Sequence, residues 1–257
     1  MSDELQLYAM TCGWLSLPEV ALIEGGASED LRIPVPCYLI VHPRGTALFD
    51  SGLGIVCQEQ ADEYMGDFAS LMRVEFLPGE EIRTRLERID IDAARVDYLI
   101  NSHLHFDHAG GNEQVSEARL IVQKREWEAA HEPDLIASIG YKPVDYDLGH
   151  DLMTIEGEHD VFGDGSVTCI PSYGHTPGHQ SLRVTLAGGD VILTGDACYL
   201  RATLEELRLP PGAAFDRDAM LESLERFRAL KARGARIFYG HDPEFWQGVP
   251  QAPARIA

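Results

Sequence analysis

The sequence feature that most restricts this chain is a string of metal-binding residue types, His103-x-His105-x-Asp107-His108, directly after the apolar run at 96–100. Imidazole nitrogens and carboxylate oxygens are the ligands that zinc-class ions prefer. His103 and His105 share one side of an extended segment, because side chains alternate with a period of two. Asp107 and His108 then turn back over the same cavity, and the glycines that follow let backbone approach closely. The string predicts a metal site at a turn between a strand and a helix.

Strand and helix patterns alternate along the rest of the chain, which is typical of an α/β fold. The pattern predicts strands at residues 37–41, 46–49, 96–100, 120–122, 167–170, 181–185, 191–193 and 236–239. It predicts helices at 80–89, at 124–130 and from an N-cap at Asp216 to about residue 233. The length of 257 residues suits one domain spanning 1–257. The tail from Val249 to Ala257 is rich in Pro and Ala and is expected to pack loosely.

Metal-binding residue types outside the string also follow predicted strands. Like His103 at the start of the string, the residues that come just after a predicted strand are Asp50, His175, Asp196 and His241. Residues at the carboxyl ends of strands in α/β folds converge on a common crevice. Because one ion takes about four to five donors, these positions predict one site built from distant segments.

The charge balance limits the partners. The chain has 21 basic and 42 acidic residues, a net charge of −21, which disfavours nucleic acid and anionic membranes. No apolar run approaches the roughly 20 residues that cross a bilayer. The N-terminus, Met1-Ser2-Asp3-Glu4, lacks the basic region of a secretory leader, so a cytoplasmic location is expected. The five cysteines form no Cys-x-x-Cys pair and are expected to be reduced, buried thiols, Cys198 among them.

These segments resemble the metallo-β-lactamase superfamily, and most closely its dinuclear N-acyl homoserine lactonases, which are quorum-quenching enzymes. The matching text lies at residues 35–39, 49–52, 102–112, 176–182, 196–199 and 240–242. The resemblance spans roughly residues 33 to 242. It implies an αββα sandwich, in which two mixed sheets are flanked by helices. It also implies a metal-dependent hydrolase whose substrate is a small acyl lactone.

The resemblance assigns the ligands of two divalent ions, with zinc expected and iron, cobalt or manganese as alternatives. The first ion would be held by His103, His105 and His175, the second by Asp107, His108 and His241, and Asp196 would bridge the two. A hydroxide between the ions would attack the lactone carbonyl. The first ion and Tyr199 would stabilise the oxyanion. The second ion would bind the leaving ring oxygen, and Asp107 would then protonate it.

Other residues have supporting roles in this prediction. Asp50 would fix the orientation of a ligating imidazole, and His179 would do the same or would brace its own loop. Phe68 and Tyr64 would line a pocket for the acyl chain, or would only pack their loop onto the core. His42, in a turn, and His131, near a helix end, are expected to be solvated.

Rival functions remain open at this point. A thioesterase of the glyoxalase II type shares the metal set but needs basic residues for the glutathione carboxylates, and only Arg201 and Arg208 follow Asp196 closely. A true β-lactamase with a cysteine ligand would carry it in place of Asp196. An RNA-processing nuclease needs a positive face, and a flavodiiron enzyme needs a flavin domain. A non-catalytic binding protein would have lost ligands. Oligomeric state is undecided, with a homodimer as one alternative.

Overall fold

Two sheets form the centre of the computed structural model, which describes residues 4–212 and 214–256. The first sheet has the order β4-β1-β2-β3-β5-β6-β7 and the second β12-β11-β10-β9-β8. The strands of the first are β1 (Gln6–Pro18), β2 (Asp30–His42), β3 (Gly45–Phe49), β4 (Arg73–Glu75), β5 (Tyr98–Ile100), β6 (Arg119–Gln123) and β7 (Leu152–Ile155). Those of the second are β8 (His159–Asp160), β9 (Val167–Pro171), β10 (Gln180–Leu186), β11 (Gly189–Leu193) and β12 (Arg236–Phe238). Each sheet contains both parallel and antiparallel pairs, so both are mixed.

Short helices connect and cover these strands. They are α1 (Glu19–Leu22), α2 (Ala61–Met65), α3 (Ile82–Glu87), α4 (Phe106–Ala109), α5 (Lys124–Ala129), α6 (Pro133–Leu135), α7 (Pro143–Tyr146), α8 (Arg201–Glu206), α9 (Arg217–Ala232) and α10 (Pro243–Trp246). Five 3₁₀ turns and one π-helical turn, η5, are also present in the described residues: η1 (Ile55–Gln58), η2 (Gly66–Ser70), η3 (Ala93–Arg95), η4 (Asn112–Val115), η5 (Ile136–Gly140) and η6 (Gly195–Ala197). In the described part of the chain, none of the helices has the length and apolar character that crossing a bilayer requires.

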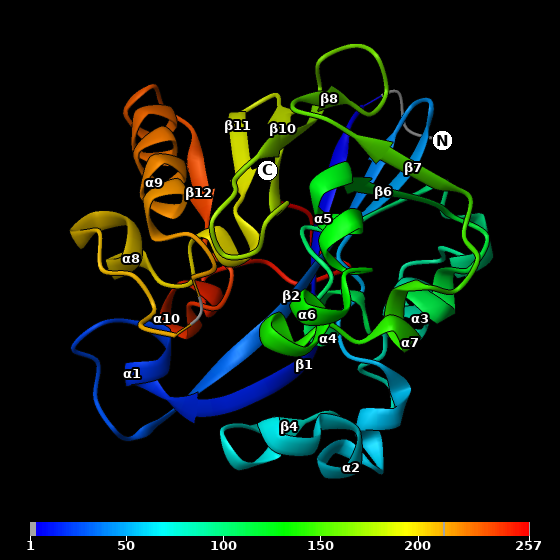
Figure 1. The fold of residues 1–257 in the computed structure, drawn as a ribbon. Helices are drawn as coiled ribbons and strands as arrows, with labels where there is room; N and C mark the ends of the chain where they lie inside the picture. Colours follow the sequence, from blue (N-terminus) through cyan, green and yellow to red (C-terminus); the bar gives the residue numbers. More distant parts are fainter. Residues whose placement is uncertain (1–3, 213, 257) are drawn as a thin grey trace.

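The sheets pack face to face, and alternation along the strands divides their side chains between inner and outer layers. Tyr38 and Ile40 of β2 meet Val191 and Leu193 of β11 in the core between the sheets. Leu39 of β2 points the other way and packs with α3. Figure 1 shows α8 and α9 beside β11 and β12 on one side of the molecule, with α3 and α7 on the opposite side. The predicted αββα sandwich is confirmed.

Helix α9 illustrates how the sequence determines an element. Asp216 caps it, accepting hydrogen bonds from the backbone N–H groups of Asp218 (3.1 Å) and Ala219 (3.0 Å), as predicted. Such a cap stabilises a helix by about 1 kcal/mol. Met220, Leu224 and Phe227 recur at helical spacing and are buried against the outer face of the second sheet.

Several parts of the fold differ from expectation. Strands β1, β4, β7 and β8 were not predicted, and β1 is, with β2, the longest strand. The prediction of a loosely packed tail is wrong for residues 249–256, whereas Ala257 lies outside the described residues: Ile256 is 5% exposed and its N–H donates to the Leu7 carbonyl at 2.9 Å. The N–H of Ala252 donates in the same way to Ala9 at 2.8 Å. The tail lies along β1 and supplies the hydrogen bonds that this part of the sheet would otherwise lack.

Candidate metal centre

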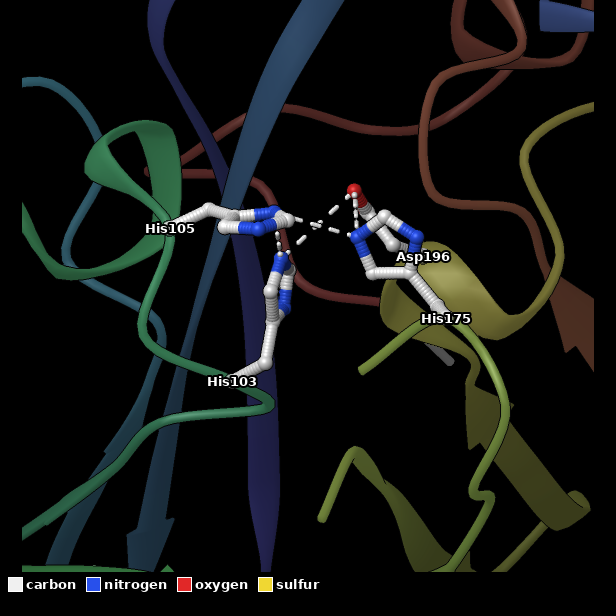
Figure 2. Close-up of side chains that lie close together, drawn as sticks. All are labelled: His103, His105, His175 and Asp196. Carbon is white, nitrogen blue, oxygen red and sulfur yellow. Dashed lines mark hydrogen bonds and ion pairs between the residues drawn. The ribbon is translucent and has the colours of Figure 1, made fainter. Parts of the chain in front are cut away.

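Four side chains from three segments converge in what we call the first ligand group, which comprises His103, His105, His175 and Asp196. Their potential ligand atoms all lie within 4.8 Å of one another. His105 Nδ1 lies 2.9 Å from His103 Nε2 and 3.1 Å from His175 Nε2, and Asp196 Oδ2 lies 3.3 Å from the latter. Figure 2 shows the three rings and the carboxylate pointing toward one another. Three imidazole nitrogens and an anionic oxygen around one point form a suitable ligand set for a divalent cation.

The second ligand group comprises Asp107, His108 and His241, whose ligand atoms also lie within 4.8 Å of one another. Asp196 faces this group through its other oxygen. Oδ1 of Asp196 is 3.1 Å from His108 Nε2 and 3.0 Å from His241 Nε2. One carboxylate therefore addresses both groups, one oxygen to each.

Local structure explains why the string 103–108 can supply both groups. His105 has extended backbone angles (φ −71, ψ 156) and is the N-cap of α4, so His103 and His105 precede the helix while Asp107 and His108 lie in its only turn. The two glycines that follow are sterically required. A Cβ on Gly110 would lie 2.4 Å from the Gly54 nitrogen, and one on Gly111 would lie 2.3 Å from the Ser51 oxygen.

Protonation states in the first ligand group suit metal binding. Burial lowers the pKa of His103, and the nearby His108 lowers it further. Burial likewise lowers the pKa of His105. For Asp196, burial acts to raise the pKa, but His108, His241 and His103 outweigh it and hold the pKa well below its usual range. Neutral imidazoles beside an ionised carboxylate are the forms that coordinate a metal.

The electrostatics of the second ligand group also suit a cation, but for a different reason. Burial acts to lower the pKa of His108, but Asp196 and Asp107 outweigh it and raise the pKa. The same competition, led by Asp196, raises the pKa of His241. A cation among these groups would take the place of the proton that the carboxylates attract. His108 Nε2 and Asp196 Oδ1 are buried and lie 3.1 Å apart, yet neither makes a contact with hydrogen-bond geometry among the described residues, as expected of ligand atoms.

Outer nitrogens of the ligating rings are also engaged, which fixes the ring orientations. The contacts are His103 Nδ1 to Ser102 Oγ (2.9 Å), His105 Nε2 to the Ile139 carbonyl (3.2 Å), His108 Nδ1 to Asp50 Oδ2 (2.8 Å) and His241 Nδ1 to the Pro34 carbonyl (2.8 Å). The inward nitrogens are left with lone pairs that face the two ligand groups.

Asp50 lies behind the imidazole of His108, a candidate ligand, in the position that its predicted role requires. Its Oδ2 pairs with His108 Nδ1 and accepts from the Ser102 hydroxyl at 2.8 Å, while Oδ1 accepts from the Ser102 N–H at 2.7 Å. Its backbone has a positive φ of 58°, in the left-handed region that non-glycine residues seldom adopt and that aspartate tolerates better than most.

His179 lies behind Asp196. Its Nε2 accepts from the Asp196 N–H at 3.0 Å and its Nδ1 pairs with Ser172 Oγ at 2.8 Å. Burial, followed by His175, lowers the pKa of His179, which leaves the ring neutral and able to accept. The ring therefore contacts the backbone of Asp196 on one side and its own loop, through Ser172, on the other, and among the described residues it does not orient a candidate ligand imidazole by a hydrogen bond.

Tyr199 reaches the same site from the segment after η6. Its hydroxyl lies 3.4 Å from His175 Nδ1, and its ring centroid lies 5.4 Å from that of His241. Burial, reinforced by the Asp196 and Asp107 carboxylates, raises the pKa of Tyr199, so its hydroxyl keeps its proton and acts as a hydrogen-bond donor.

A cavity of about 400 Å³ opens onto both ligand groups. Its lining residues are Leu15, Leu17, Leu22, Ile33, Phe68, Met72, His105, Phe106, Asp107, Ser138, Ile139, Gly140, His175, Asp196, Tyr199, Gly212, Ala214, Phe215 and His241. Phe68 lines the cavity as expected, but Tyr64 is not among these residues. The Tyr64 hydroxyl donates to Asp145 Oδ2, and its ring packs against Phe106 with the centroids 6.3 Å apart.

The carboxyl of Asp145 gives a pH-dependent prediction. Burial raises the pKa of Asp145 from its ordinary value of 3.8 to about 6. Because the folded state favours the protonated form of Asp145, this group stabilises the folded protein below about pH 4, and that contribution is lost as the pH rises through about 6. Relative to Asp145→Asn, the wild-type free energy of unfolding should therefore fall by up to about 3 kcal/mol across this window. Denaturant titrations at both pH values test this, with the exposed Asp147→Asn as the control. Parallel pH profiles for wild type and Asp145→Asn would contradict it.

The remaining histidine and cysteine predictions have mixed outcomes. His42 is 4% exposed, stacks on Phe162 with centroids 4.1 Å apart and pairs with Asp164 at 2.9 Å, so the prediction that it is solvated is wrong. A distant loop covers the turn, which a local pattern does not reveal. His131 is exposed, as predicted. The five cysteines are buried and free, as predicted.

Comparison with known proteins agrees with this geometry. The family model for the metallo-beta-lactamase superfamily matches residues 31–241. The chain is 33% identical to the N-acyl homoserine lactonase AttM of Azorhizobium caulinodans, over 97% of this chain and 98% of the relative. It is 34% identical to the N-acyl homoserine lactonase AiiA of Bacillus thuringiensis subsp. kurstaki, over 83% of each chain. A solved N-acyl homoserine lactone hydrolase with N-hexanoyl-L-homoserine at its catalytic metal centre superposes with a TM-score of 0.88, at 30% identity, covering 100% of both chains.

Proposed function

Since the chain belongs to the metallo-beta-lactamase superfamily and, within it, to the N-acyl homoserine lactonase family, we propose that it hydrolyses the lactone ring of N-acyl homoserine lactones. The observation that carries this proposal is the pair of ligand groups joined by Asp196 at the end of a cavity. The metal-centre geometry and the relatives support the same reaction. We further propose that residues 1–257 form a single hydrolase domain.

The ligand groups support a site for two zinc ions. His103, His105 and His175 would hold one ion, Asp107, His108 and His241 the other, and Asp196 would bridge them. Two divalent ions at such a site supply Lewis-acid polarisation of a carbonyl and a nucleophile derived from water near neutral pH. Nitrogen and oxygen ligands also accept iron, cobalt or manganese.

Asp107 and Tyr199 would serve the leaving oxygen and the carbonyl oxygen of the lactone. Asp107 Oδ2 lies 3.5 Å from His108 Nε2 and 3.7 Å from His241 Nε2, at the wall of the cavity. From there its carboxyl can pass a proton to the ring oxygen that departs as the ester bond breaks. The Tyr199 hydroxyl stays protonated and can donate to the carbonyl oxygen as negative charge develops on it.

The cavity is suited to an acyl chain. Leu15, Leu17, Ile33 and Met72 contribute apolar side chains to its lining, and Phe68 adds an aromatic ring. Burial of each methylene group of a substrate stabilises the complex by about 0.8 kcal/mol. We therefore propose that the substrates carry long acyl tails.

A glyoxalase-type thioesterase is the second candidate, because it would use the same ligand set. Glutathione carries carboxylates that need cationic partners in the protein. Among the described residues that line the cavity, none is Lys or Arg. The lining favours a neutral acyl substrate over glutathione.

An activity panel tests the proposal. Homoserine lactones with acyl chains of increasing length should be hydrolysed, with kcat/KM rising up to about fourfold per methylene until the cavity is full. A glutathione thioester and a β-lactam, assayed with the same metal-loaded protein, should be turned over far more slowly. Fully metal-loaded protein that is inactive on every lactone of the series, or faster on the thioester, would refute the substrate assignment.

A further inference from the structure

Glu126 is a buried carboxylate next to the segments of the first ligand group, and it has no role in the proposed hydrolysis. It lies in the first turn of α5, three residues after β6 ends, and has no exposed surface. Its oxygens accept four hydrogen bonds. Oε1 accepts from the Leu104 N–H (3.1 Å) and the Tyr141 hydroxyl (2.8 Å), and Oε2 from the Gly178 N–H (2.9 Å) and the Thr176 hydroxyl (2.7 Å).

The donors to Glu126 come from the segments that carry the first ligand group. Leu104 lies between His103 and His105 in the chain, and Thr176 directly follows His175. Through these hydrogen bonds Glu126 links the two segments that supply all three imidazoles of the first ligand group. The second ligand group is held by other partners, since the outer nitrogens of its imidazoles contact Asp50 and Pro34.

Packing shows how tightly the loop of His175 is seated on α5. A Cβ on Gly178 would lie 2.1 Å from the Glu126 nitrogen, so only glycine fits there. Burial raises the pKa of Glu126, although all four donors lower it. Placing a carboxylate in an enclosed site is energetically costly, and an apolar side chain would fill the space more cheaply. The full set of donors therefore points to a role other than core stability.

We propose that Glu126 is a positioning residue that holds His103, His105 and His175 in the arrangement a metal ion requires. This inference rests on the proposed function of the first ligand group as a metal site. It predicts a selective effect, because Glu126 supports one ligand group and does not line the cavity.

Glu126→Gln is a sharp test because of how the donors are divided. Each carboxylate oxygen accepts one backbone N–H and one hydroxyl. A hydroxyl can rotate and become an acceptor, but a backbone N–H cannot. Whichever way the glutamine amide is turned, its NH₂ group faces a backbone N–H, and one segment is released.

The experiment titrates metal-free protein with Co²⁺ against a competing chelator, following cobalt absorption. Glu126→Gln should weaken binding at the first ligand group by about 10- to 100-fold and leave the second much less affected. In lactone assays at saturating metal, kcat should fall with little change in KM. The control is Glu128→Gln, on the same helix with a side chain 63% exposed, which makes the same charge change.

A milder variant guards against misfolding. Tyr141→Phe removes one hydroxyl donor and should weaken the same site by a smaller factor, with the cobalt spectrum altered in the same direction. The inference is overturned if Glu126→Gln binds cobalt like wild type, if Glu128→Gln loses as much, or if both ligand groups weaken equally. If the wild-type protein itself binds no cobalt, the proposed metal centre fails first. If cobalt binds as expected but no lactone is opened, only the substrate proposal fails.

Discussion

Asp107→Asn is expected to lower kcat by at least about 10³-fold, because one side chain has two roles whose losses multiply. Asparagine keeps the size of the side chain but cannot deliver a proton to the leaving alkoxide. It also removes the negative charge that faces His108 and His241 at 3.5 and 3.7 Å. Steady-state kinetics on one lactone, with metal content determined for each preparation, measures the effect. Asp134→Asn, an exposed site on α6, controls for the loss of one charge.

Tyr199→Phe provides the internal comparison. Tyr199 supplies one neutral hydroxyl, a donor worth about 1–3 kcal/mol, so its removal should lower kcat only about 10- to 100-fold. Metal content should stay the same, since Tyr199 belongs to neither ligand group. Equal losses in the Asp107 and Tyr199 variants would contradict the roles assigned to them.

Asp196→Asn is expected to have the other large effect. The two oxygens of Asp196 face different ligand groups, at 3.3 Å from His175 Nε2 and 3.0 Å from His241 Nε2. An amide provides one neutral oxygen in place of two charged ones, so it cannot serve both groups. Metal content should fall from two ions per chain to one or fewer, and kcat by about 10³-fold or more. Elemental analysis after gel filtration, beside the same Asp134→Asn control, measures this. A variant that retains both ions and most of its activity would show that Asp196 does not bridge.

The parts of the fold that the sequence predicts well are those whose patterns are local. Strand β9 is buried at its first four residues and β11 at its last three, because both faces of the sheet are covered there, and the apolar residues of these stretches predict a strand. Helix α9 has its own cap and a periodic apolar face. The sequence also predicts which residues form the ligand groups, because His103, His175 and His241 each come shortly after the end of a strand. Residues at the carboxyl ends of strands in an α/β fold lie near one another.

What the sequence did not reveal depends on distant contacts. The tail is ordered by β1, far away in the chain, and His42 is covered by the loop that contains Phe162. The carbonyls of Pro34 and Ile139 contact the candidate ligand rings of His241 and His105. Every residue has a backbone carbonyl, so the sequence cannot indicate which ones make such contacts. Glu126 could have been suspected, because it follows the end of β6 as the ligands follow other strands. Its four donors, however, come from loops that only the fold brings together.

If seven side chains enclose two cations with Asp196 between them, anomalous diffraction at the zinc edge from crystals of zinc-loaded protein should locate both ions. We expect two anomalous peaks, one on each side of Asp196. One should lie about 2.0–2.2 Å from the inward nitrogens of His103, His105 and His175, and the other at similar distances from Asp107, His108 and His241. A single peak, no peak in zinc-loaded crystals, or peaks remote from Asp196 would show that these side chains do not form a two-metal centre.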